Sequence, residues 1–172
     1  NLPGLPLISR VEATRGIPSL GRDLRSIGYE TLFLYGGDAQ FDNMSGFLTT
    51  NGFDRVIEEE DFNPRPPGTK WGVFDHYVFE RAIAELDQMS EPAFVTLFTT
   101  TSHQPWTIPP EYEDRIPEFS SDRYRDGAVE KTMAYVDLAL ADFLEVASQK
   151  DWYENTIFVF IADHGLSVHT DD

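Results

Sequence analysis

The chain has 172 residues, 41% of them hydrophobic, which supplies one sizeable core and too little material for two independent ones. Lys and Arg number 13 against 30 Asp and Glu, a formal charge of −17, so a nucleic-acid backbone would be repelled and is excluded as an expected partner. The absence of cysteine excludes disulfides, thiolate zinc sites and cysteine nucleophiles.

The first half of the chain predicts helices and one strand behind an extended entry. Residues 1–18 are rich in proline and glycine, which is typical of an extended segment. Apolar residues at helical spacing between Ser19 and Gly28 predict a short helix that Gly28 ends, and the run 29–35 then predicts a strand. The next predictions are a helix over 41–50, a surface loop over 58–67 and a helix over 75–89.

The second half predicts two buried strands on either side of the longest helix. The run 93–99 is nearly continuously apolar or β-branched, as expected for a strand covered on both faces. A surface loop over 109–126 then leads to an amphipathic helix over 126–150, and 156–162 is the next buried strand. Strands that alternate with helices indicate an α/β fold, with a mostly parallel sheet and helices on both faces.

Polar residues follow each predicted strand. Loops at the carboxyl ends of parallel strands converge on one edge of the sheet, where ligands bind in such folds. The residues at these ends are Gly36-Gly37-Asp38, Ser102-His103 and Asp163-His164-Gly165. We therefore expect a candidate site that draws on all of these loops.

Asp163 and His164 are the candidate metal ligands. A carboxylate beside an imidazole at a strand end offers an oxygen and a nitrogen to a divalent cation such as zinc or manganese. Gly165 leaves room for close approach of a substrate. The alternative is that Asp163 caps the next turn while His164 bonds a carbonyl group, and the two residues alone leave both interpretations open.

His103, Asp42 and Asn43 are the candidate substrate-binding residues. His103 is expected near the same edge, where it could contact a phosphate oxygen or protonate a leaving group; the alternative is a surface histidine stacked on Trp106. Asp42 and Asn43 follow a Gly-Gly turn and could bind a polar head group. Asp38 is interpreted as the cap of the following helix.

An ordered series of motifs runs through almost the whole chain. Its members are Tyr35-Gly36-Gly37-Asp38, Phe41-Asp42-Asn43-Met44, Asn51-Gly52-Phe53, Trp71-Gly72-Val73, Ser102-His103-Gln104-Pro105, Glu154-Asn155-Thr156 and Ala162-Asp163-His164. Together they resemble the lipoteichoic-acid-synthase-like phosphoglycerol transferases of the sulfatase and alkaline phosphatase superfamily.

The resemblance implies a metal-dependent transferase. Such enzymes move a phosphoglycerol-type group from a phospholipid to a cell-envelope glycan or polymer, at the extracytoplasmic face of a bacterial inner membrane, with manganese expected and zinc or magnesium as alternatives. By motif position, Asp163 and His164 match metal ligands and His103 matches a histidine that contacts the substrate phosphate. The competing functions are a sulfatase or phosphodiesterase of the same superfamily, and a non-catalytic interaction module.

The chain departs from the family pattern in two ways. Tyr35, Asp42 and Met44 stand where polymer synthases have a histidine, a tryptophan and an arginine, so those glycerophosphate contacts do not transfer. The family's threonine nucleophile lies upstream of the proline-rich entry, and Thr14 falls after that position, so no catalytic residue is assigned here. We expect residues 1–172 to be a single partial catalytic domain, inactive alone, whose membrane segments lie elsewhere.

Overall fold

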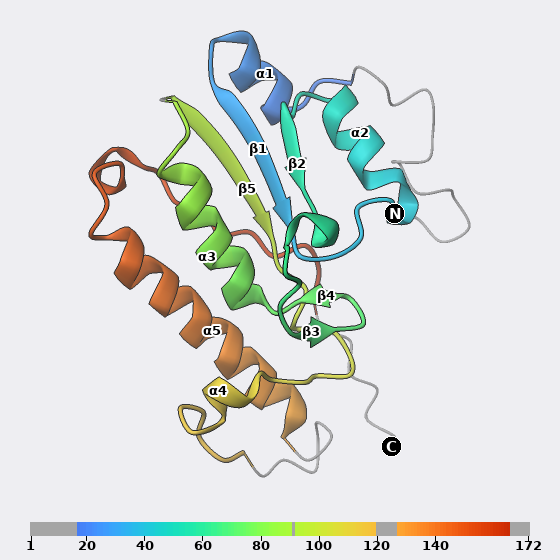
Figure 1. Cartoon of the computed structure of the whole chain (residues 1–172), viewed down its shortest axis with the longest axis vertical. Coiled ribbons are helices and arrows are strands. Elements are labelled where there is room, and N and C mark those ends of the chain that lie inside the picture. Colours follow the sequence, from blue (N-terminus) through green and yellow to red (C-terminus); the bar gives the residue numbers. More distant parts are fainter. Residues whose placement is uncertain (1–16, 91, 120–126, 166–172) are drawn as a thin grey trace.

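A parallel sheet forms the centre of the structure, a computed structural model that describes residues 17–90, 92–119 and 127–165. Strand β1 (Glu30–Tyr35) lies in the middle of the three-stranded order β2-β1-β5 (Figure 1). It pairs in parallel with β2 (Arg55–Ile57) on one side and with β5 (Ala93–Phe98) on the other. The carboxyl ends of all three strands therefore point to one edge.

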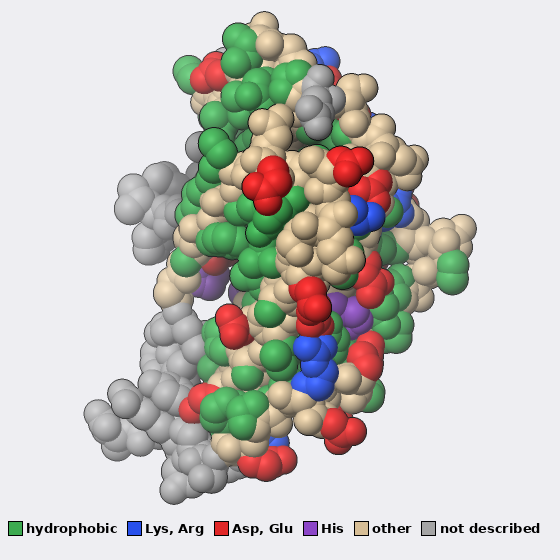
Figure 2. Space-filling view, turned by 90° about the vertical axis from the view of Figure 1, so that its left-hand side faces the viewer, with side chains coloured by type: hydrophobic (Ala, Val, Ile, Leu, Met, Phe, Trp, Pro, Cys, Tyr) green, Lys and Arg blue, Asp and Glu red, His purple; other side chains and the backbone are tan. Residues whose placement is uncertain are grey.

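The surface is acidic, as the charge of −17 requires. Red Asp and Glu side chains outnumber blue Lys and Arg side chains on the face seen in Figure 2. Among the described residues, no helix has both the length and the apolar character that crossing a membrane demands.

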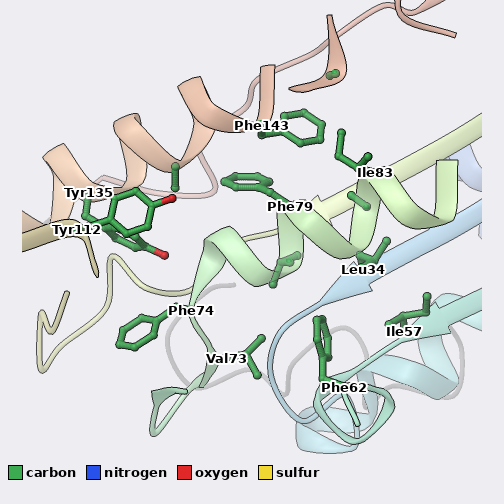
Figure 3. Packing of buried hydrophobic residues seen from close by; sticks show 14 of the residues in the cluster. Leu34, Ile57, Phe62, Val73, Phe74, Phe79, Ile83, Tyr112, Tyr135 and Phe143 are labelled. Atoms are coloured by element: carbon green, nitrogen blue, oxygen red, sulfur yellow. The ribbon is translucent and has the colours of Figure 1, made fainter. Parts of the chain in front are cut away.

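Helices cover both faces of the sheet, as predicted. Leu32 and Leu34 of β1 belong to a large apolar cluster with α3 (Asp75–Leu86) and α5 (Ala128–Ala147) (Figure 3). Phe33, next along the strand, belongs to a second cluster with α2 (Met44–Thr50). Successive side chains of a strand point to opposite faces, so a strand buried on both sides carries apolar residues on both faces.

The helix predictions are confirmed, with ends at most three residues from the expected ones. In α1 (Leu20–Ser26) the Ser19 hydroxyl accepts a hydrogen bond from Arg22 N at 3.2 Å, and Gly28 follows with a φ of +99°. The predicted helix over 41–50 is divided into η3 (Phe41–Asn43) and α2. Asp42 and Asn43 break it because both have a φ of +56°, a left-handed conformation that Asp and Asn tolerate.

Several short elements were not predicted. They are β2, β3 (Gly68–Thr69), β4 (Gly72–Val73), η4 (Glu59–Asp61), α4 (Pro110–Glu113) and η5 (Tyr153–Asn155). Each is too short to show a period in the sequence. β3 and β4 pair as an antiparallel hairpin near the carboxyl edge of the sheet.

The prediction of a buried strand over 156–162 is wrong. These residues form no strand and are mostly exposed, with Ile157 at 90% and Ile161 at 85% relative exposure. Phe158 alone packs inward, with its ring 5.4 Å from that of Tyr153. An apolar run becomes a strand only when a neighbour takes up its backbone hydrogen bonds. The residues of β5 are only half-buried. The prediction that this strand is covered on both faces is therefore wrong.

Candidate functional site

The loops that leave β1 and β2 are tied together at the carboxyl edge of the sheet. The Glu58 carboxylate, directly after β2, accepts hydrogen bonds from Ala39 N at 2.8 Å and from Gln40 Nε2 at 3.2 Å. Glu59 N donates to the Gly37 carbonyl at 3.0 Å. These contacts fix the Gly-Gly turn that follows β1.

The β3–β4 hairpin connects this turn to the loop after β5. Val73 N donates to the Gly36 carbonyl at 2.9 Å, and a Cβ at Gly37 would overlap the Trp71 carbonyl. On its other side the hairpin contacts the loop after β5, because Trp71 Nε1 donates to the Gln104 carbonyl at 2.6 Å. The hairpin thus holds two strand-end loops at a fixed separation.

His103 is an exposed residue on the loop after β5. Its ring centroid lies 5.4 Å from Trp71 and 5.8 Å from His164. The aromatic ring beside His103 is that of Trp71, inclined by 43° to the imidazole, and not that of Trp106 as the alternative interpretation suggested. His103 and His164, 61 positions apart in the chain, therefore lie close together as expected, although the residues before Asp163 form no strand.

Asp163 and His164 form a close pair on the surface. His164 Nε2 lies 3.3 Å from Asp163 Oδ2, and the side chains of His164 and Asp163 are 60% and 55% exposed. His164 N donates to Asp163 Oδ1 at 2.8 Å, and His164 Nδ1 lies 3.0 Å from the Gly165 carbonyl. These local bonds match the alternative interpretation of a turn cap and a carbonyl contact.

The pair also fits a divalent cation in its donor chemistry, because an exposed carboxylate and an exposed imidazole can exchange local partners for a metal. Within the described ranges, no group of three or more His, Asp or Glu side chains is arranged to hold a metal ion. Asp163 and His164 can therefore supply two ligands of a site that needs more.

Asp42 and Asn43 lie on the connection from β1 to α2, where Asp42 is half-buried and Asn43 is exposed (Figure 1). Asp38 closes a local turn by accepting from Gln40 N at 2.8 Å, instead of capping the helix as predicted. Burial, and then the charges of Asp38 and Glu59, raise the pKa of Tyr35, which keeps this phenol protonated beside the turn. Thr14 lies outside the described residues.

Two residues of this edge, Trp71 and Asp75, were not identified as functional from the sequence. Asp75 is fully buried at the start of α3, and Thr100 N donates to its carboxylate at 2.8 Å. The available signal was a single carboxylate, beside His76, inside the otherwise largely apolar run 71–79. An acidic residue at the start of a helix is common, so its burial could not be inferred.

Comparison with known proteins shows the class of protein to which this chain belongs. The Sulfatase family model matches residues 4–171. This chain belongs to the Sulfatase family.

Two individual relatives show which kinds of protein within the family this chain resembles. The chain is 29% identical over 148 residues to the lipoteichoic acid synthase-like protein YvgJ of Bacillus subtilis, covering 85% of this chain and 24% of that protein. It is 25% identical over 181 residues to phosphoglycerol transferase I of Citrobacter koseri, covering 94% of this chain and 23% of that protein. The chain thus spans about a quarter of the length of these relatives.

Solved structures show the same fold. A Vibrio parahaemolyticus protein of the alkaline phosphatase superfamily matches with a TM-score of 0.69 and 32% identity, over 84% of this chain and 35% of that one. The lipoteichoic acid synthase LtaP of Listeria monocytogenes matches with a TM-score of 0.71 and 23% identity, over 84% of this chain and 37% of that one.

Proposed function

We propose that this chain is part of a metal-dependent transferase that moves a phosphoglycerol-type group from a phospholipid donor to a cell-envelope glycan or polymer. The observation that carries the proposal is the meeting of His103 with His164 at the carboxyl edge of the sheet, in a chain of the Sulfatase family. The relatives named as a phosphoglycerol transferase and a lipoteichoic acid synthase-like protein support the choice of transferred group.

Asp163 and His164 serve in this proposal as two ligands of a divalent metal, with manganese first and zinc or magnesium as alternatives. When bound, such an ion neutralises charge on the phosphoryl oxygens and lowers the pKa of a hydroxyl nucleophile. The remaining ligands and the nucleophile come from outside the described residues. Residues 1–172 are then one partial catalytic domain, which is inactive alone.

His103 contacts the phosphate or protonates the leaving oxygen, because its exposed imidazole lies beside the Asp163-His164 pair. Asp42 and Asn43 bind the polar head group. A phospholipid donor and a cell-envelope acceptor place the reaction at the extracytoplasmic face of a bacterial membrane, reached through membrane segments elsewhere in the protein.

Asp163→Ala and His164→Ala in the full-length protein test the metal assignment. We expect each to lower the release of diacylglycerol from fluorescent phosphatidylglycerol by about 100-fold or more, because several kcal/mol of charge stabilisation would be lost. Isothermal titration should show weaker manganese binding by both variants.

Asp114→Ala is the matched control, since it removes an exposed carboxylate beyond α4. It should retain both activity and manganese affinity. Full activity of the Asp163 and His164 variants would refute the metal role. Analysis of products with and without a glycan acceptor then decides between transfer and hydrolysis, because water as the acceptor leaves free glycerol phosphate.

A further inference from the structure

We propose that Asp75 is a positioning residue for His103: its buried carboxylate fixes the start of the loop after β5 and thereby holds the imidazole beside His164. The inference rests on the proposed function, since it concerns the same site.

The contacts of Asp75 are directed to the loop and not to its own helix. Its Oδ1 accepts from Thr100 N at 2.8 Å and from Thr101 N at 3.2 Å, while its own N donates to Thr101 Oγ1 at 3.1 Å. An acidic side chain at a helix start usually satisfies the free amides of that helix. Here it satisfies two amides of a segment 25 and 26 residues away.

Burial makes these bonds strong determinants of the loop position. Asp75 is 0% exposed, and Thr100 and Thr101 are 5% and 1% exposed, so water cannot replace the carboxylate. Removing it would leave two buried amides without an acceptor, a state that a loop avoids by moving.

The anchored segment leads directly to the imidazole. His103 N donates to the Thr100 carbonyl at 3.1 Å, closing a turn on the residue that Asp75 holds. Trp71 fixes the far side of His103 through the Gln104 carbonyl at 2.6 Å. His103 therefore lies between two attachment points, and loss of the inner one should displace its ring. A displacement of about 1 Å at a reacting group can cost about 100-fold in rate.

A double-mutant cycle in the full-length protein tests this role, with turnover of fluorescent phosphatidylglycerol as the assay. We expect Asp75→Ala to lower kcat by about 10- to 100-fold in the wild-type background and by less than about 3-fold in the His103→Ala background. Asp75→Asn keeps the side-chain shape and one acceptor oxygen, so it should fold and fall between wild type and Asp75→Ala.

The cycle separates positioning from a general loss of folded protein. A variant that only reduces the folded fraction lowers activity by the same factor in both backgrounds. Thr31→Val provides this comparison, because Thr31 is also buried and hydrogen-bonded but lies at the opposite end of β1. Any loss that it causes should be the same in both backgrounds.

Two results would overturn the inference, and they differ. Equal losses from Asp75→Ala in both backgrounds would refute the positioning role while leaving the proposed function intact. A fully active His103→Ala variant would refute the role of His103 itself, and this inference with it.

Discussion

Asp75 is a fully buried carboxyl group, and burial raises its pKa to about 6 from 3.8 although hydrogen bonds from Thr100 and Thr101 oppose the shift. The folded state therefore holds this proton more tightly than the unfolded state. The resulting stabilisation is present below about pH 4 and is lost as the pH rises through about 6. A pKa shift of this size changes the free energy of unfolding by about 3 kcal/mol in all.

Asp75→Asn removes this titration. Between pH 4 and pH 7, the free energy of unfolding of the variant should therefore rise by about 2 kcal/mol relative to that of the wild type. Urea denaturation at several pH values measures the difference, and a difference independent of pH would contradict the prediction.

Asp54→Asn is the control with the opposite sign. Burial raises the pKa of Asp54, but hydrogen bonds from Thr31 and the guanidinium of Arg25 outweigh it and hold the pKa below the usual value. The carboxylate thus stabilises the fold above pH 4, and this stabilisation is lost on acidification. Relative to the wild type, Asp54→Asn should become less stable as the pH rises.

At the scale of elements, the β3–β4 hairpin is the part that joins the strand-end loops, and Gly72 sets its position. Gly72 has a φ of +139°, and a Cβ there would overlap the carbonyl of Gly36. Gly72→Ala should cost about 1–3 kcal/mol in backbone strain and about another 1–3 kcal/mol through this overlap. Urea denaturation measures the loss.

Gly28→Ala is the matched control, because Gly28 also has a positive φ, of +99°, but nothing lies within 4 Å of its Cβ position. Gly28→Ala should therefore lose only the stability that backbone strain costs. Equal losses for the two variants would show that contact with the Gly36 turn does not constrain the hairpin. Trp71 fluorescence should change in Gly72→Ala and not in Gly28→Ala, since Trp71 precedes Gly72 in the hairpin.

At the scale of the whole molecule, the charge of −17 sets the response to salt. Ion pairs such as Arg115 with Asp142 weaken as salt is added, but 30 acidic residues repel one another against only 13 basic ones. Screening should therefore raise the melting temperature between 10 and 200 mM NaCl, by about 2–4 °C for each kcal/mol of repulsion removed. Choline chloride should act equally if the effect is screening, and a falling melting temperature would contradict it.

The sequence by itself was sufficient for features that depend on local periodicity. The helices of 20–26, 75–86 and 128–147 and the strands of 30–35 and 93–98 follow from apolar spacing and from glycine at chain reversals. The meeting of His103 with His164 was expected as well, although the strand over 156–162 from which it was inferred does not form. The motif series pointed to the family, which the match over residues 4–171 confirms.

Tertiary structure alone decided which residues are neighbours across the chain. The run 156–162 has the composition of a buried strand, yet whether it becomes one depends on a partner for its backbone groups. The burial of Asp75 against Thr100, and the contact of His103 with Trp71, likewise depend on segments about 25 and 32 residues apart. Local sequence sets the conformation of a segment, whereas hydrogen bonds and burial are completed by groups distant in the chain, and these make the candidate site.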